Sequence, residues 1–150
     1  MTEKTPVALE RTDYRLFTPV PTRWCDADAL GHINNAVSVS YIESGRIDYF
    51  AQVCQFGLTG ERYGFVIAHL DVNFIQQIHH PSQLEVASKI SRLGNSSFDV
   101  DTVIYQQAEH QPLISSRGVC VWLDLQNNTS LRLPDDIRQA IINFEQRTIV

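Results

Sequence analysis

The chain has 150 residues, a length typical of one domain, and its 43% hydrophobic and 19% charged residues exclude a disordered or fibrous protein. A formal net charge of −5 argues against general nucleic-acid binding, which needs many lysines and arginines against phosphates. Three widely spaced cysteines, a polar N-terminus and the lack of any run of ~18 apolar residues predict a cytoplasmic protein without a membrane span.

The first element is a strand. Side chains alternate in character over residues 14–24, which predicts a strand with one buried face. Pro19 and Pro21 each lack the N–H group that a neighbouring strand would accept, so this strand should lie at a sheet edge or carry a bulge. Residues 24–35 are polar and contain Gly31, which predicts a loop.

One long helix follows the loop. Residues 35–55 contain no proline, and Asn34 or Asn35 can cap the first amides. At helical spacing its apolar side chains form an arc wider than a surface helix needs, so we expect the sheet to wrap the helix. Glu43 and Arg46 fall inside this arc, three residues apart. The apolar arc consists of Ala36, Val39, Ile42, Ile47, Tyr49, Phe50, Val53 and Cys54.

The second half of the chain changes to a period of two. Strands are predicted at 65–74, 84–93, 97–105 and 113–124, with a hairpin turn at 94–96. A short final helix opens at Leu133-Pro134-Asp135-Asp136. The order favours an α+β fold: an antiparallel sheet with the long helix across one face, in a single domain over 1–150 with residues 1–11 flexible.

The densest group of polar side chains precedes the long helix: Asp26, Asp28, His32, Asn34 and Asn35. Capping and the helix dipole alone would account for such residues. Alternatively, free N–H groups at the helix start stabilise a developing oxyanion, and a nearby carboxylate either attacks the carbonyl carbon or deprotonates water. These are the two parts that acyl transfer needs. Motifs of serine hydrolases, P-loop enzymes, dinucleotide enzymes and zinc ribbons are absent.

The run RWCDADALGHINN at 23–35, followed by Tyr41-Ile42-Glu43 and Arg46, resembles the signature of hotdog-fold acyl-CoA thioesterases of the 4-hydroxybenzoyl-CoA thioesterase-like group. The similarity extends from about residue 12 to the end. It implies a curved antiparallel sheet around one long helix, homodimers or homotetramers with active sites between protomers, and hydrolysis of acyl-CoA to a free acid and CoA without a cofactor.

The resemblance also implies site residues. It places the catalytic carboxylate at Asp28 and the amide that polarises the thioester carbonyl near Asn35; we interpret Asp26 as a capping or structural residue. In an extended chain the two carboxylates would share a side, and the pKa of one would rise. His32 either assists catalysis or only bonds to backbone. Expected substrate contacts are Gly31, Asn34, Tyr41, Glu43 and Ser97, although basic residues that precede this serine in relatives are replaced by Gly94 and Asn95.

Several further charged and histidine residues have structural interpretations. Glu43 and Arg46 are predicted as a partly buried ion pair that fixes the helix against an interface, with Glu43 as a possible second carboxylate near the thioester. His69, His79 and His80 are interpreted as surface histidines, so no metal site is predicted. Two rival functions stay open: a hydratase or dehydratase on the same scaffold, and a module that binds acyl-CoA without turnover.

Overall fold

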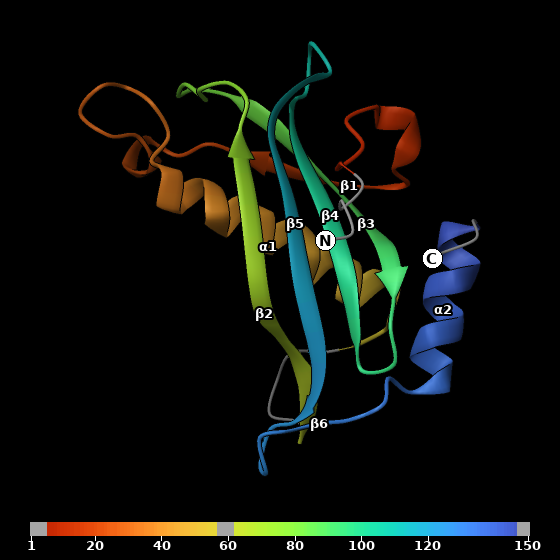
Figure 1. The fold of residues 1–150 in the computed structure, drawn as a ribbon. Coiled ribbons are helices and arrows are strands. Elements are labelled where there is room, and N and C mark those ends of the chain that lie inside the picture. The colour runs from red at the N-terminus through yellow and green to blue at the C-terminus, as the bar shows by residue number, and fades with distance from the viewer. Residues whose placement is uncertain (1–5, 57–61, 147–150) are drawn as a thin grey trace.

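The computed structural model describes residues 6–56 and 62–146. Within them, one antiparallel sheet has the strand order β1-β3-β4-β5-β2, with β6 paired to β5 (Figure 1). The strands are β1 (Leu16–Pro21), β2 (Tyr63–Phe74), β3 (Gln83–Leu93), β4 (Ser97–Gln106), β5 (Gln111–Asp124) and β6 (Thr129–Ser130). The helices are α1 (Asn35–Gln52) and α2 (Asp135–Glu145), with short 3-10 helices at Arg11–Asp13 and Trp24–Asp26.

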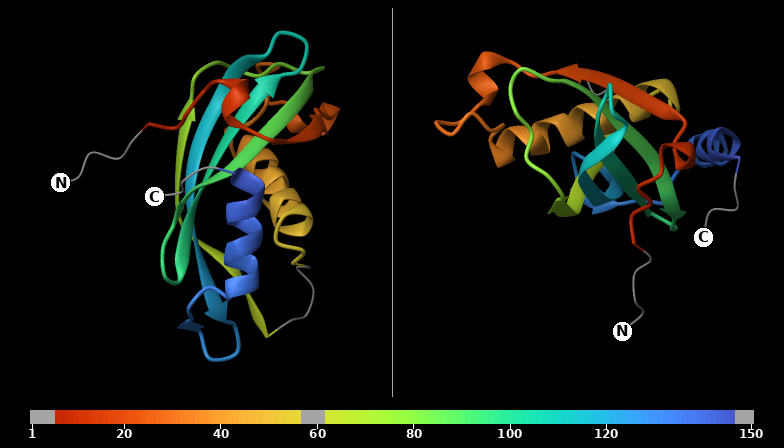
Figure 2. Two further views of the ribbon diagram at one scale, coloured as in Figure 1. Left: turned by 90° about the vertical axis from the view of Figure 1, so that its right-hand side faces the viewer. Right: turned by 90° about the horizontal axis from the view of Figure 1, so that it is seen from above.

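The predicted fold class is confirmed. The sheet curves around α1, and α2 packs beside β3 (Figure 2). The edge position predicted for the first strand is also confirmed, because β1 pairs with β3 alone. Pro19 and Pro21 therefore lie where one side of the strand needs no partner. Each of the four strands predicted in the second half is present, with ends shifted by a few residues at most.

The buried face of α1 differs in part from the predicted arc. Ile42, Tyr49 and Phe50 are buried as expected, whereas Ala36 and Ile47 are exposed, so that part of the prediction is wrong. The sheet covers α1 from one side, and the buried face includes Tyr41 instead. Gly45 is also buried. It lies so close to β3 that a Cβ atom at this position would collide with the Val86 side chain.

The N-terminal segment lies across the outer face of the sheet (Figure 2). The Tyr14 hydroxyl donates to the Ala8 carbonyl at 2.7 Å, and the Tyr105 hydroxyl donates to the Leu9 carbonyl at 2.7 Å. Ala8 thus contacts Tyr14 and Leu9 contacts β4, while the expected flexibility of residues 1–11 stays a prediction. Residues 1–5 of that expectation lie outside the described residues.

A buried carboxylate joins α2 to the rest of the fold. Glu145 accepts hydrogen bonds from the Tyr49 hydroxyl at 2.6 Å and from the Ile90 amide at 2.9 Å. Burial raises the pKa of Glu145, since the charged form loses hydration there. The charged carboxylate therefore makes the folded state less favourable as pH rises above the ordinary glutamate pKa of ~4.3.

We expect Glu145→Gln to raise stability relative to the native protein, and to do so more at about pH 8 than at about pH 5. The glutamine side-chain oxygen can keep both hydrogen bonds but carries no charge to desolvate. Thermal melting of both proteins across this pH range measures the difference. A difference that shrinks as pH rises would contradict the expected sign.

No helix among the described residues is long and apolar enough to cross a membrane. All three cysteines are free, with Cys25 exposed and Cys54 and Cys120 buried. The buried pair lies in the core cluster where α1, the sheet and α2 meet.

Candidate active site

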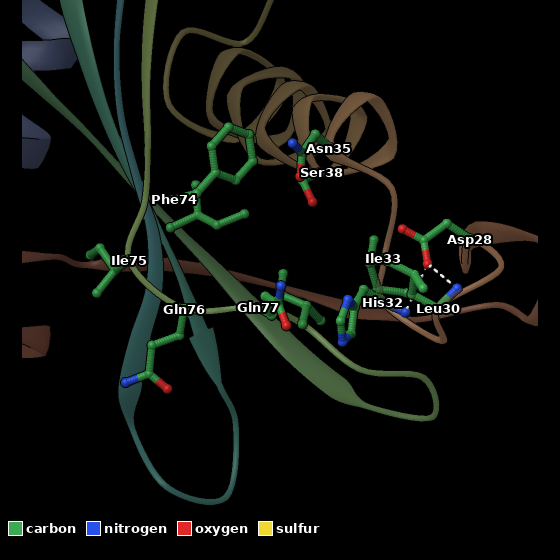
Figure 3. A pocket seen from close by; sticks show the side chains of 12 residues that line it. Asp28, Leu30, His32, Ile33, Asn35, Ser38, Phe74, Ile75, Gln76 and Gln77 are labelled. Atoms are coloured by element: carbon green, nitrogen blue, oxygen red, sulfur yellow. Dashed lines mark hydrogen bonds between the residues drawn. The ribbon is translucent and has the colours of Figure 1, made fainter.

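The loop before α1 holds the Asp28 carboxylate in a fixed orientation. Oδ1 of Asp28 accepts hydrogen bonds from the backbone amides of Leu30, at 2.8 Å, and His32, at 3.2 Å (Figure 3). The Asp28 amide donates to the His32 carbonyl at 2.8 Å, and Gly31 closes the turn with a φ of +78°, a conformation that glycine adopts readily. Within the described residues, Oδ2 of Asp28 has no hydrogen-bond partner.

The start of α1 provides free backbone donors beside this loop. Asn34 caps the helix, because its side-chain oxygen accepts from the Ala36 amide at 2.8 Å. Its carbonyl accepts from the Ser38 amide at 3.0 Å. The amides of Asn35 and Val37 have no acceptor in the part of the chain that the structure describes, as is usual for a first helical turn.

A cavity of about 440 Å³ joins these two features. Asp28 and His32 line it from the loop, Asn35 and Ser38 line it from α1, and the segment after β2 closes the opposite side (Figure 3). The sequence argument brought Asp28, His32 and Asn35 together, and all three border this space. The sequence did not single out the other lining residues that reach the cavity only through the fold, namely Phe74, Ile75, Gln76, Gln77, Ile78 and Ile114.

His32 contributes to the loop through its backbone, as described above, and to the cavity through its ring. The imidazole packs edge-on against that of His79, with 4.7 Å between ring centroids. A backbone bridge also links these two residues. His32 thus holds Asp28 through its amide and borders the cavity with its ring, and its part in catalysis stays a prediction.

Asp26 has a different environment from Asp28. It is 2% exposed and accepts hydrogen bonds from the Arg23 guanidinium at 2.8 Å and from the Tyr41 hydroxyl at 2.6 Å. These bonds, that of Arg23 foremost, hold the pKa of Asp26 well below its usual range. The expectation that like charge raises the pKa of one carboxylate of the pair is not met at Asp26, because the hydrogen bonds from Arg23 and Tyr41 lower its pKa instead.

The expected substrate contacts occupy several places. Gly31 lies on the other side of the loop, where a second hollow of about 350 Å³ also borders Asp28. Tyr41 is buried behind the loop with its hydroxyl bound to Asp26, and burial raises its pKa. The side chain of Glu43 is 59% exposed and lies 3.4 Å from the 11% exposed Arg46, so the predicted pair has only one buried member. Neither Tyr41 nor Glu43 lines the cavity.

Ser97 lies at the turn between β3 and β4, at the opposite end of the protomer from the Asp28 loop (Figure 1). Within one protomer it therefore does not adjoin the cavity. Two arginines that the sequence argument did not consider flank this turn. Arg92 lies 3.4 Å from the Ser97 hydroxyl, and Arg138 of α2 donates to the Gly94 carbonyl at 2.6 Å.

The described residues contain no group of three or more histidine, cysteine, aspartate or glutamate side chains placed to hold a metal ion. His69 pairs with Asp71 at 3.0 Å on β2, and His80 packs against the exposed ring of Trp24.

Comparison with known proteins decides the family. The thioesterase-like superfamily matches residues 20–141, which include the loop, α1 and the whole cavity. The chain belongs to this superfamily. This thioesterase-like chain also resembles a solved thioesterase from Thermus thermophilus, described as complexed with coenzyme A and zinc, with 30% identity, a TM-score of 0.81, and coverage of 90% of this chain and 97% of the other.

Two characterised relatives differ in the carrier of the acyl group. The acyl-acyl carrier protein thioesterase ATL3 of Arabidopsis thaliana is 26% identical over 96% of this chain and 70% of its own length. The long-chain acyl-CoA thioesterase FadM of Escherichia coli is 23% identical over 83% of this chain and 95% of its own length. Both are named as thioesterases, so the shared reaction is thioester cleavage and the carrier varies.

Proposed function

We propose that this chain hydrolyses acyl-CoA thioesters to a free acid and CoA, with Asp28 as the working carboxylate. The observation that carries the proposal is the shared cavity: a carboxylate with one free oxygen and a helix start with free amides border the same space. A thioester carbonyl is already electrophilic and its thiolate leaves readily. One carboxylate and one or two donors therefore suffice for the reaction.

The Asp28 carboxylate has two routes to the product. As a nucleophile, its free oxygen attacks the thioester carbon, CoA leaves as the thiolate, and water then cleaves the resulting mixed anhydride. As a general base, it takes a proton from a water molecule that attacks the same carbon. Both routes need one free carboxylate oxygen on a side chain of fixed orientation. The amides of Leu30 and His32 both donate to Oδ1, which fixes the side chain and leaves Oδ2 free.

The helix start serves the developing oxyanion. Backbone amides at a helix N-terminus point outward, and the helix dipole favours negative charge there. In the proposed complex the Asn35 amide donates to the thioester oxygen, and the ring of His32 faces the same group across the cavity. Tyr41 acts through Asp26, which it holds in place behind the loop. Glu43 and Ser97 would meet substrate only where a second protomer brings them to the cavity.

The test is release of free thiol from a panel of acyl-CoA thioesters and the matching acyl-acyl carrier proteins. We expect release from acyl-CoA in every case where the acyl group fits the cavity. Faster thiol release from the acyl-acyl carrier proteins than from the acyl-CoA thioesters would identify the acyl carrier protein, and not CoA, as the carrier of the substrate. Tight binding of acyl-CoA without thiol release would favour a binding module, and loss of enoyl-CoA absorbance without free thiol would favour a hydratase.

We also propose that the protein works as a homodimer joined through β2. This strand pairs with β5 on one side only, so its other edge has unpaired backbone groups. Large apolar side chains remain exposed on and after this strand, namely Ile67 and Phe74 of β2 and Ile75 after it. A second copy paired along β2 would satisfy the edge and cover these side chains.

We expect Ile67→Lys to shift the protein from dimer to monomer, because the substitution places a charge in the apolar contact. Ile67 is 42% exposed in the protomer, so the change does not disturb the core. The matched control is Ile142→Lys, at a position that is 39% exposed on α2, away from β2. Light scattering coupled to size exclusion measures the mass. Equal masses for both variants would contradict the proposed interface.

A further inference from the structure

The loop around Asp28 is held at both of its ends by the segment that follows β2. At the start of the loop, the Thr22 amide donates to the Ser82 carbonyl at 3.0 Å, and the Ser82 amide donates to the Thr22 hydroxyl oxygen at 2.8 Å. At the end of the loop, the Ile33 amide donates to the Ile78 carbonyl at 2.7 Å. The carboxylate therefore lies between two points at which this segment is attached to the loop.

Two adjacent histidines lie inside this segment, and each packs its ring against the loop. Nδ1 of His80 lies 2.9 Å from the Thr22 hydroxyl, and its ring meets that of Trp24 edge-on with 5.9 Å between centroids. The His79 ring meets the His32 ring edge-on with 4.7 Å between centroids, and a backbone bridge joins these two residues. The two histidines thus contact opposite ends of the loop.

The contact between His79 and His32 fixes the direction of a ring that borders the cavity. The His32 ring lines the cavity (Figure 3), whereas His79 is exposed and is not among the described residues that line it. Within residues 6–56 and 62–146, no hydrogen bond holds the His32 imidazole. Its edge-on contact with His79 is therefore the interaction that orients it, since such ring pairs have a preferred geometry.

We infer that His79 is a positioning residue, whose ring holds the His32 imidazole in one orientation toward the bound thioester. The inference rests on the proposed thioesterase function and adds to it a residue outside the cavity. A hydrogen bond from an imidazole depends on the direction of its nitrogen. An imidazole that rotates freely spends less time aligned with the carbonyl, so loss of the His79 ring slows the chemical step more than it weakens substrate binding.

The experiment measures kcat and KM for thiol release from one acyl-CoA that the native protein hydrolyses. We expect His79→Ala to lower kcat about tenfold and to change KM by less than about twofold. His79→Phe should restore at least about half of the native kcat, because the phenyl ring keeps the edge-on contact. Since His79 is exposed, the melting temperature of both variants should stay close to that of the native protein.

The matched control is His110→Asn. It removes an exposed imidazole from the turn between β4 and β5, where the φ of +54° is a conformation that asparagine tolerates. His110 is not among the residues that line the cavity. Both kinetic constants of this variant should therefore equal those of the native protein.

A double variant tests whether His79 acts through His32. We expect His32→Ala alone to lower kcat. Adding His79→Ala to it should lower kcat no further, because no ring is left to orient. A further tenfold loss in the double variant would mean that His79 acts on another group, and it would overturn the inference.

The outcomes separate the two proposals. If the native protein releases no thiol from any acyl-CoA of the panel, the proposed function fails, and the inference fails with it. If the native protein releases thiol but His79→Ala or His32→Ala is as fast as the native protein, the inference is overturned while the function stands. A folded His79→Phe protein as slow as His79→Ala would overturn the role of ring packing.

Discussion

Asp28→Asn is expected to lower kcat for thiol release by about 10²–10⁴-fold while the melting temperature stays close to that of the native protein. The asparagine oxygen can still accept the amides of Leu30 and His32, so the loop keeps its shape. The free carboxylate oxygen is replaced by an NH₂ group, which can neither attack the thioester nor accept a proton from water. Activity is therefore lost without loss of the fold.

The matched control is Asp136→Asn. Asp136 is an exposed carboxylate in the first turn of α2, far along the chain from the loop, and its removal costs only part of a favourable helix-dipole interaction. Steady-state kinetics with one acyl-CoA, together with thermal melting, measures both variants. An Asp28→Asn protein as fast as Asp136→Asn would remove Asp28 from the proposed mechanism.

The fold could be predicted from the sequence to a large extent because its elements have strong local patterns. Alternation of side chains gave the strands, and Pro19 and Pro21 gave the edge position of β1. The exposed and buried faces of α1 were less well predicted. Helical periodicity places Ala36 in the apolar arc, but burial depends on where the sheet ends, and the sheet leaves that residue uncovered.

The candidate site was also predicted only in part, because some of its residues belong to a local motif and others depend on the fold. Asp28, His32 and Asn35 lie within eight residues of one another, so a local motif is enough to bring them to one cavity. The other lining residues come from β2, β5 and the segment after β2, and no local pattern distinguishes Phe74 or Ile114 from the other apolar residues of the strands. The short 3-10 helix at Trp24–Asp26, which places the Asp26 carboxylate between Arg23 and Tyr41, was not predicted either. Its sequence shows no glycine or proline that would predict a turn.

Asp26→Ala is expected to lower the free energy of unfolding by about 1–3 kcal/mol, because it leaves the buried Tyr41 hydroxyl without an acceptor. Tyr41→Phe alone removes one hydrogen bond but leaves Asp26 bonded to Arg23, so its effect should be about 0.5–1.5 kcal/mol. In the double variant no unpaired hydroxyl remains. The double variant should therefore be less destabilised than the sum of the two single changes.

The effect of Asp26 also has a predicted pH dependence. Its folded-state pKa is lowered, first by the hydrogen bond from Arg23, so its contribution to stability is present above the ordinary aspartate pKa of ~3.9 and is lost as pH falls below that value. Urea denaturation at about pH 7 and about pH 3 should then give a smaller difference between native protein and Asp26→Ala at the lower pH. A difference that is equal at both values, or larger in acid, would mean that the charge of Asp26 is not what holds the loop to α1.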